Sequence, residues 1–218
     1  RELEVVNAAN SRHLDTYKDF LYNRLQRQGF DRHDIHRLAA RDRHVFSALM
    51  LQHGHGDGLV TGATRKSAHV LSLLNHVFDA RASDGAVGVT ALLHKGRIVL
   101  IGDTLVHEWP EPEDLATIAI RAAGVARSLG MEPRVAFVSF STFGYPVSER
   151  ATKMHLAPGL LDGRKVDFEY EGEMTVDVAL NPEVMAHYPF CRLTGPANIL
   201  VVPARHSASI SVKLMQEM

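Results

Sequence analysis

The sequence predicts an α/β fold, because a strong helix pattern, a buried strand and a small-residue turn follow one another in its middle. Apolar residues recur at helical spacing over residues 115–129, with Pro112 before them and Gly130 after them. A short run of apolar and β-branched residues then follows Pro133 and predicts a buried strand. Small hydroxylated residues lead from this strand to Gly144. Ligands bind at the carboxyl ends of strands in open α/β sheets, so a site is expected at this turn.

The composition fits one large domain or two small lobes. The chain has 218 residues, of which 45% are hydrophobic, and this is ample for a core. The formal net charge of -1 gives no electrostatic reason to expect nucleic acid or an anionic membrane as a partner. No apolar run approaches the roughly 18 residues of a membrane span, and no signal peptide is evident. Arg1 is not an initiator methionine, so we expect a piece of a longer polypeptide.

Thiol and metal chemistry are not expected. Cys191 is the only cysteine, so neither an intrachain disulfide nor a thiolate metal site can form, and a small buried hydrophobe is favoured over a nucleophile. His53 and His55 alternate with glycines, which make a floppy scaffold for a metal, and no further ligands are placed nearby. A helix end followed by a loop is the favoured alternative. The same holds for His33 and His36, which share a helix face without other ligands.

The amino-terminal part predicts helices that begin at polar caps. Ser11 can cap a helix over residues 12–28, and Asp31 and Asp42 can cap two further helices. Short polar side chains suit these positions because they accept the free N–H groups of a first helical turn.

Residues 59–66 predict a strand followed by a turn into a helix that runs to Phe78. The glycine spacing is not that of a phosphate-binding P-loop. The turn still places the hydroxyl of Thr61 and the cations Arg65 and Lys66 at the start of a helix, where anions bind favourably. Both cations can instead be solvated first-turn residues. Ligand contact is favoured for Arg65, and solvation for Lys66.

Residues 87–94 and 97–103 predict two strands joined in a hairpin by the Lys-Gly pair between them. Polar residues end the second strand, among them Asp103, His107 and Glu108. These side chains could be acid/base catalysts or metal ligands. Hydrogen bonds to the backbone of the loop are the favoured alternative.

The carboxyl-terminal part alternates helices with short strands. A helix is expected over residues 148–161, with Pro158 as a late break. Residues 166–173 alternate apolar and acidic side chains and predict a strand with one polar face. A short helix or turn is expected over residues 174–180, and another short helix from Asn181. The last strand is expected over residues 198–203 and the last helix over residues 207–216.

Several motifs, taken in chain order, resemble those of a known family. They are Thr61-Gly62-Ala63, residues 139–144, Glu171-Gly172-Glu173, residues 177–180 and residues 195–200. Through them nearly the whole chain is similar to the phosphate acetyl/butyryl-transferase family. Three further segments resemble more closely the phosphotransacetylase-like carboxyl-terminal domain of the large bacterial NADP-dependent malic enzymes, namely residues 168–174, 188–193 and 206–211.

The resemblance implies a three-layer αβα fold of two lobes with a cleft between them. It assigns residues 1–75 to part of the first lobe, residues 76–204 to the second, and residues 205–218 to a last helix that returns to the first. The family's opening strand and helix, and the catalytic domains of a malic enzyme, are expected outside this chain. A cytoplasmic location and a homodimer, or higher homo-oligomer, through the second lobe are also implied.

Departures from the family pattern decide the expected activity. True phosphotransacetylases follow their last strand with Pro-Asp or Pro-Asn and a Gly-Asn pair, before a helix that contains Tyr-Lys. Here Ala204 follows Pro203, residues 207–209 replace the Gly-Asn turn, and Lys213 is retained. The family's catalytic Ser-Arg pair and a following Asp are expected beyond Met218. Acyl transfer without that arginine and carboxylate lacks electrostatic and base catalysis, so no catalytic residue is expected in this chain.

The resemblance therefore implies a regulatory domain that binds acetyl-CoA as the effector of a malic enzyme in the same polypeptide. The alternative is a working phosphate acetyltransferase, which makes acetyl-CoA from acetyl phosphate. NADP and a divalent metal are expected only in the malic enzyme part. Because acetyl-CoA is anionic, its site needs cations, helix amino ends and backbone donors. The candidate acetyl-CoA residues at the lips of the cleft are Thr61, Arg65, Ser141, Thr142, Gly144, Asn198, Ser207, Ser209 and Lys213.

Overall fold

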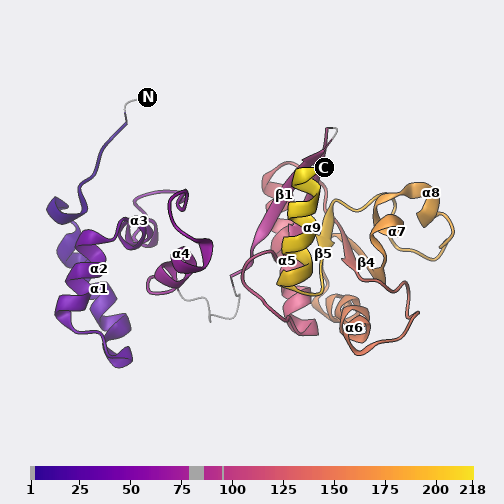
Figure 1. The fold of residues 1–218 in the computed structure, drawn as a ribbon, viewed down its shortest axis with the longest axis horizontal. Coiled ribbons are helices and arrows are strands. Elements are labelled where there is room, and N and C mark those ends of the chain that lie inside the picture. Colours follow the sequence, from indigo (N-terminus) through magenta and orange to yellow (C-terminus); the bar gives the residue numbers. More distant parts are fainter. Residues whose placement is uncertain (1–2, 79–85, 95) are drawn as a thin grey trace. The chain divides into compact units, whose positions relative to one another are not determined.

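A computed structural model describes residues 3–78, 86–94 and 96–218. The chain divides into two units, Arg1–Ser83 and Asp84–Met218 (Figure 1). Each unit has its own hydrophobic core. The boundary between the units lies outside the described residues. The lobe ranges 1–75 and 76–204 therefore stay predictions, as does the return of residues 205–218 to the first lobe.

The described part of the first unit is built of helices around one core. Tyr17 and Phe46 are aromatic members of this core, and aliphatic side chains from all four α-helices or their ends complete it. The helices are α1 (Leu14–Leu25), α2 (Arg32–Arg41), α3 (Arg43–Gln52) and α4 (Ser67–Leu74), with the 3-10 turns η1 (Ala8–Asn10) and η2 (Gln26–Gln28).

Polar caps set where two of these helices begin. Asp31 and Asp42 each accept backbone N–H groups from the following turn, at 2.8 and 2.9 Å for the shortest contacts, which confirms both predicted caps. The predicted cap at Ser11 is wrong. Ser11 already ends η1, and its hydroxyl accepts the backbone N–H of His13 at 3.2 Å, so α1 begins two residues later than expected.

The prediction of a strand just before the turn at residues 61–66 is also wrong. Leu59 and Val60 have no regular secondary structure. Val60 is fully exposed, and the described part of the first unit contains no strand with which it could pair. An isolated strand leaves its backbone groups without partners, so the apolar pair forms a loop instead.

The second unit contains a sheet whose described strands lie in the order β1-β2-β5-β3-β4. Figure 1 labels three of them, β1, β5 and β4. β1 pairs antiparallel with β2, which confirms the predicted hairpin, although Lys95 of its turn lies outside the described residues. All other neighbours in the sheet are parallel. The strands are β1 (Val89–His94), β2 (Arg97–Gly102), β3 (Arg134–Val138), β4 (Glu169–Met174) and β5 (Ile199–Val201).

Helices cover both faces of this sheet, which confirms the predicted three-layer αβα arrangement. Successive strand residues point to opposite faces, so Val135 and Phe137 belong to one core cluster and Ala136 and Val138 to the other. Gly130, with a φ of +75°, ends the first covering helix as predicted. α5 (Pro112–Ser128) and α6 (Glu149–Arg164) pack on the first cluster, and α7 (Val176–Leu180), α8 (Pro182–Met185) and α9 (Arg205–Glu217) contribute to the second.

Pro158 does not break its helix, contrary to the sequence prediction. α6 continues through it to Arg164. A proline inside a helix removes one backbone hydrogen bond and costs about 3 kcal/mol. The buried side chains of Met154, Ala157 and Leu161 pack into the core on either side of Pro158, and this packing offsets the local cost.

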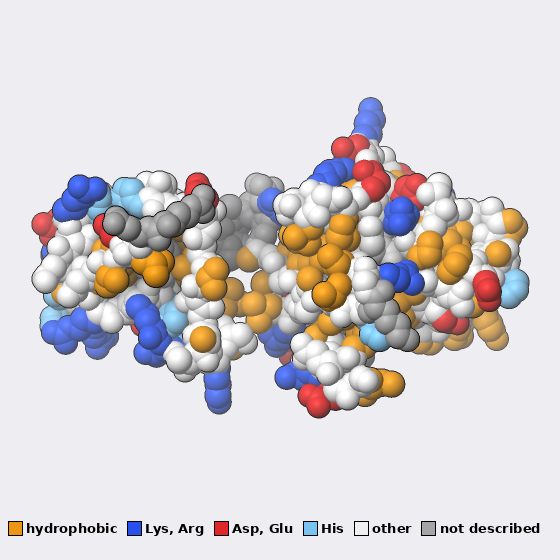
Figure 2. Space-filling model, turned by 90° about the horizontal axis from the view of Figure 1, so that it is seen from above, with side chains coloured by type: hydrophobic (Ala, Val, Ile, Leu, Met, Phe, Trp, Pro, Cys, Tyr) orange, Lys and Arg blue, Asp and Glu red, His pale blue; other side chains and the backbone are white. Residues whose placement is uncertain are grey.

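The predicted polar face of β4 is not exposed to water. Glu171 is 6% exposed and Glu173 is fully buried. Glu171 accepts the backbone N–H of Arg192 at 2.9 Å and pairs with its guanidinium at 3.2 Å. These contacts compensate Glu171 for the loss of water, and the pattern within the strand cannot reveal them because Arg192 is distant in sequence. Figure 2 shows that hydrophobic side chains also gather in patches on the surface of this unit.

Candidate ligand-binding site

Several loops of the second unit gather at one edge of the sheet. β2, β5, β3 and β4 run parallel, so the segments that follow them share the carboxyl edge. These segments include residues 103–110, residues 139–144 and the start of α9. Backbone N–H groups and short side chains at such an edge can close on a ligand.

Asp103 organises the first of these segments. It is 2% exposed, and its carboxylate accepts the backbone N–H groups of Gly88, Leu105 and His107 at 2.9, 2.7 and 2.8 Å. Its Oδ2 also lies 2.6 Å from Nδ1 of His107. Burial raises the pKa of this carboxyl group, but the hydrogen bonds outweigh burial and lower the pKa overall. The preferred interpretation of Asp103 as a loop-bonding residue is therefore confirmed.

Glu173 accepts the hydrogen bonds that fix the second segment, residues 139–144. Its Oε1 accepts the hydroxyl of Ser141 and the backbone N–H of Gly144, both at 2.8 Å, and its Oε2 lies 2.9 Å from Nδ1 of His155. Ser141 is fully buried, and the hydroxyl of Thr142 accepts the backbone N–H of Thr175, just after β4, at 3.2 Å. Both hydroxyls thus hold the turn in place. Ligand contact by Ser141, Thr142 and Gly144 stays a prediction.

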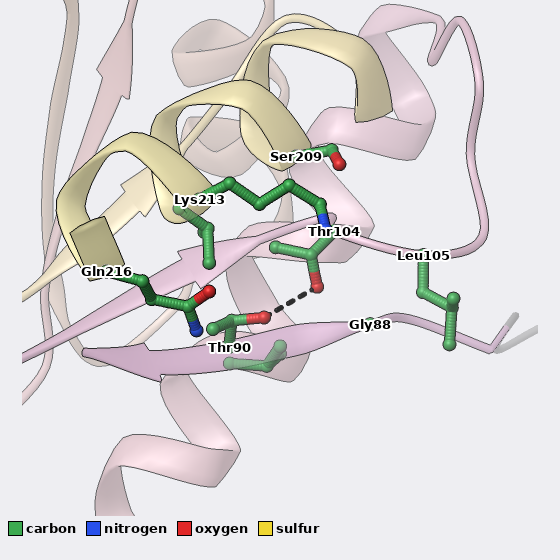
Figure 3. A pocket seen from close by; sticks show the side chains of 9 residues that line it. Gly88, Thr90, Thr104, Leu105, Ser209, Lys213 and Gln216 are labelled. Carbon is green, nitrogen blue, oxygen red and sulfur yellow. Dashed lines mark hydrogen bonds between the residues drawn. The ribbon is translucent and has the colours of Figure 1, made fainter. Parts of the chain in front are cut away.

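A pocket of about 350 Å³ lies between β1, the loop after β2 and α9 (Figure 3). Thr90 Oγ1 donates to Thr104 Oγ1 at 3.0 Å, and the side chain of Lys213 extends along the pocket toward Thr104 (Figure 3). No acidic partner of Lys213 is found among the described side chains. We call this site the α9 pocket; it is lined by Gly88, Val89, Thr90, Thr104, Leu105, Ser209, Val212, Lys213 and Gln216.

The α9 pocket can hold an anionic group. An ammonium group and the hydroxyls of Thr90, Thr104 and Ser209 lie around it, and these are donors suited to phosphate or carboxylate oxygens. Ser209 and Lys213 were expected at the site, whereas Thr90 and Thr104 were not. A threonine in or just after a strand carries no pattern that marks it as a ligand contact, because β-branched residues are common there.

The structure does not bring Asn198 to this edge. Asn198 precedes β5, so it lies at the opposite, amino edge of the parallel strands. Its Oδ1 accepts the backbone N–H of Arg134 at 2.8 Å, and its Nδ2 donates to the carbonyl of Glu132 at 2.7 Å. Ser207 lies in the first turn of α9, where its hydroxyl donates to the carbonyl of Ala204 at 2.8 Å.

Thr61 and Arg65 belong to an exposed basic turn of the first unit. The hydroxyl of Thr61 is hydrogen-bonded to Nδ1 of His44, and Nη1 of Arg65 lies 3.1 Å from Nε2 of His69. Lys66 is the cap residue of α4 and gives it no side-chain hydrogen bond. This turn presents the cations and hydroxyls that were expected for an anionic ligand.

The described residues contain no group of three or more His, Cys, Asp or Glu side chains that could hold a metal ion. His53 and His55 pack around Tyr17, whose hydroxyl lies 2.6 Å from Nδ1 of His55. Cys191 is partly buried against the second core cluster. Within the described ranges, no helix combines the length and the apolar character needed to span a bilayer.

The fold is an α/β domain of the three-layer type, and the lining of the α9 pocket is suited to an anion. The family profile for Phosphate acetyl/butaryl transferase matches residues 1–218. The chain belongs to this family, and the resemblance noted in the sequence is confirmed.

The chain is similar both to malic enzymes and to phosphate acetyltransferases. The chain is 50% identical over 216 residues to the NADP-dependent malic enzyme of Rhizobium meliloti (strain 1021). This match covers 99% of the chain but only 28% of that enzyme. It is 29% identical to the phosphate acetyltransferase of Thermoanaerobacterium thermosaccharolyticum, over 99% of the chain and 68% of the relative. The solved structure of EutD phosphotransacetylase from Staphylococcus aureus superposes with a TM-score of 0.85 at 25% identity, over 99% of this chain and 67% of that one.

Proposed function

We propose that this chain is the regulatory domain of an NADP-dependent malic enzyme and that it binds acetyl-CoA as an allosteric effector. The support is that malic enzymes match 99% of the chain with only 28% of their own length. The remainder of such a polypeptide has room for the catalytic domain that binds NADP and a divalent metal and converts malate to pyruvate by oxidative decarboxylation. Regulation then takes the form of a coupling free energy between the two sites. The proposal places this enzyme in the cytoplasm.

The observation that carries the proposal is a pocket with anion-binding groups, in a unit whose buried carboxylates at the carboxyl edge are already hydrogen-bonded. Asp103 and Glu173, the two buried carboxylates described at the carboxyl edge, accept hydrogen bonds that hold loops in place. Neither is poised as a free base for a thiol, whereas Lys213 in the α9 pocket faces hydroxyls. Such an arrangement favours binding over acyl transfer.

Acetyl-CoA is much larger than the α9 pocket, so one pocket of about 350 Å³ can take only part of it. We assign the α9 pocket, through Lys213 and Ser209, to an anionic group of the ligand. Arg65 and Thr61 of the first unit are further proposed donors to the ligand, because this turn presents a cation and a hydroxyl beside the start of α4. The domain also supports assembly into a homodimer or higher homo-oligomer.

The second candidate function is a working phosphate acetyltransferase, which interconverts acetyl-CoA and phosphate with acetyl phosphate and CoA. Its support is the match to a protein named phosphate acetyltransferase over 68% of that protein's length. The fold likeness to a phosphotransacetylase, with a TM-score of 0.85, adds to it. The altered turn after Pro203, where residues 204–209 begin α9 directly, weighs against it.

Calorimetric titration with acetyl-CoA and an acetyl phosphate–CoA exchange assay separate the two candidates. We expect saturable binding of acetyl-CoA and no exchange above background. The exchange assay should be repeated on the whole polypeptide, in which acetyl-CoA is expected to change the rate of malate-dependent NADP reduction. Robust exchange would establish the transferase. Absence of binding, with no effect on malate oxidation, would reject the regulatory proposal. Light scattering tests assembly, and a stable monomer at micromolar concentration would contradict it.

A further inference from the structure

The opposite, amino edge of the sheet in the second unit carries a groove of about 450 Å³ that the proposed function does not use. It lies where three neighbouring strands begin, because β2, β5 and β3 run parallel and side by side. Its lining comes from the start of β2, from the segment that leads from α5 into β3, and from residues 196–198 just before β5. We call it the amino-edge groove. The α9 pocket, in contrast, includes the loop that follows β2.

Asn198 ties these segments together and thereby fixes the walls of the groove. Its Oδ1 accepts the backbone N–H of Arg134 at 2.8 Å, and its Nδ2 donates to the carbonyl of Glu132 at 2.7 Å. Its backbone carbonyl accepts the N–H of Leu100 in β2, also at 2.8 Å. The segments before β5 and β3 are thus joined to each other and to β2. A site with preformed walls loses less conformational entropy when a ligand binds.

Two arginines give the groove its charge. Nε of Arg134 donates to the carbonyl of Pro196 at 2.9 Å, which fixes the direction of this partly buried side chain. Arg97 is exposed at the start of β2. Among the described side chains, neither arginine forms an ion pair. The terminal N–H groups of a guanidinium form a fork that matches the two oxygens of a carboxylate.

The acidic side chains near the groove do not neutralise these arginines. Glu169 lies opposite Arg134 in the pairing of β4 with β3, but its carboxylate accepts the backbone N–H and the hydroxyl of Thr194 at 2.9 and 2.7 Å. Glu132 is exposed and does not line the groove. Lys95, a further cation in the turn between β1 and β2, lies outside the described residues. The lining of the groove therefore favours an anion.

The rest of the lining is apolar. Ile98 is 38% exposed, and Met131 is partly buried against the first core cluster. Pro196 and Ala197 add further apolar atoms. An inorganic anion would leave these side chains in contact with water, whereas an organic anion also buries apolar surface of its own.

We propose that the amino-edge groove binds a short-chain organic monocarboxylate. Its carboxylate pairs with the guanidinium groups of Arg134 and Arg97, and its carbon chain lies against Ile98 and Met131. The site does not depend on acetyl-CoA, because it lies at the opposite edge of the sheet from the loop that lines the α9 pocket. The chain thus has a second binding site, for a ligand of different chemistry.

The test follows the methionine methyl groups of the chain by NMR while hexanoate is added. Hexanamide, which has the same carbon chain without the charge, and inorganic phosphate, which has charge without a carbon chain, are titrated in parallel. The chain has 7 methionines, so the others serve as internal controls for Met131, whose signal Met131→Leu assigns. We expect only hexanoate to shift the Met131 signal, and to do so saturably. The absence of a shift with hexanoate, or an equal shift with hexanamide, would overturn the proposal.

Substitutions of the two arginines test how the carboxylate is held. Arg134→Lys keeps the charge but lacks the fork, so it should weaken hexanoate about ten-fold, and Arg97→Ala should weaken it about three-fold. Arg27→Ala is the matched control, because it removes the same charge at an exposed arginine of the first unit. Unchanged affinity in both groove variants, or an equal loss in Arg27→Ala, would overturn the proposal.

One further variant separates this proposal from the proposed function. If Lys213→Ala abolishes the response to hexanoate while Arg134→Lys retains it, the carboxylate binds in the α9 pocket and the groove proposal fails. A response that persists in Lys213→Ala and weakens in Arg134→Lys supports the groove, whatever the result of the acetyl-CoA titration. The titration of the unaltered chain needs no charge variant, so a misfolded mutant cannot hide the answer.

Discussion

Replacing Asp103 by asparagine tests whether one buried carboxylate fixes the loop after β2, which lines the α9 pocket. The substitution keeps the shape of the side chain and changes one oxygen to an amide nitrogen. The amide oxygen can still accept the N–H groups of Gly88 and Leu105, which bond Oδ1 at 2.9 and 2.7 Å. The amide nitrogen then faces the backbone N–H of His107, which Oδ2 accepts at 2.8 Å. Two donors face each other, and the partly buried N–H of His107 loses its acceptor.

The expected cost follows from this geometry. An unsatisfied buried donor costs about 1–3 kcal/mol, and the remaining hydrogen bonds lose their charge assistance, so the free energy of unfolding should fall by about 2–4 kcal/mol. The pKa of Asp103 is lowered in the fold, where backbone hydrogen bonds outweigh the opposing effect of burial. Its contribution to stability is therefore present above the unfolded pKa of about 3.9 and is lost as the pH falls through the lower folded pKa. The asparagine variant should lack this part of the acid dependence.

Urea unfolding followed by the emission of Trp109 measures the effect, because this tryptophan lies on the loop in question. The control is Asp167→Asn, the same chemical change at an 81% exposed carboxylate that pairs with Arg127 at 2.7 Å. Exposed pairs contribute little, so no measurable change is expected there. An Asp103→Asn variant as stable as the control would refute the reasoning.

Three further predictions follow from the structure. Lys213→Ala and Arg65→Ala should each lower the affinity for acetyl-CoA about five- to a hundred-fold in calorimetry. Thr142→Val should lower it less. Unchanged affinity in both charge variants would place the ligand elsewhere. Burial raises the pKa of the Cys191 thiol, so iodoacetamide should label it more slowly in the folded chain than in urea near neutral pH; equal rates would contradict this. Burial and then the nearby His55, Arg12 and His53 lower the pKa of His13. The contribution of His13 to stability is present above about 6.5 and lost as the pH falls through the folded pKa. His13→Asn should therefore flatten the acid dependence of the free energy of unfolding of the first unit, measured by urea unfolding at several pH values, and an unchanged acid dependence would contradict this.

Local patterns predicted most helices and the sheet strands of the second unit. α5 follows from apolar spacing, Pro112 and Gly130, and α2 and α3 follow from Asp31 and Asp42. These signals act within one or two turns of chain, so the sequence contains both partners of each interaction. The motifs of the family also survive as a pattern along the chain, because each one marks a turn or a buried strand at a set place in the fold.

Contacts between distant segments decided the rest. Pro158 stays inside α6 because Met154, Ala157 and Leu161 reach a core built by other elements. Leu59 and Val60 form no strand because no sheet is described in their unit to receive them. In both cases the local sequence has the preference that was predicted, but tertiary packing outweighs it, so the prediction is wrong.

The candidate site was only partly visible in the sequence for the same reason. Ser209 and Lys213 could be suggested from their place on the last helix, but Thr90 joins them only because β1 folds back beside β2. Glu173 could be noticed as an acidic residue in a strand, yet its burial depends on hydrogen bonds from Ser141 and from His155. A side chain's neighbours in sequence decide its backbone conformation, whereas burial and ligand contact depend on residues that only the folded chain brings within a few ångströms.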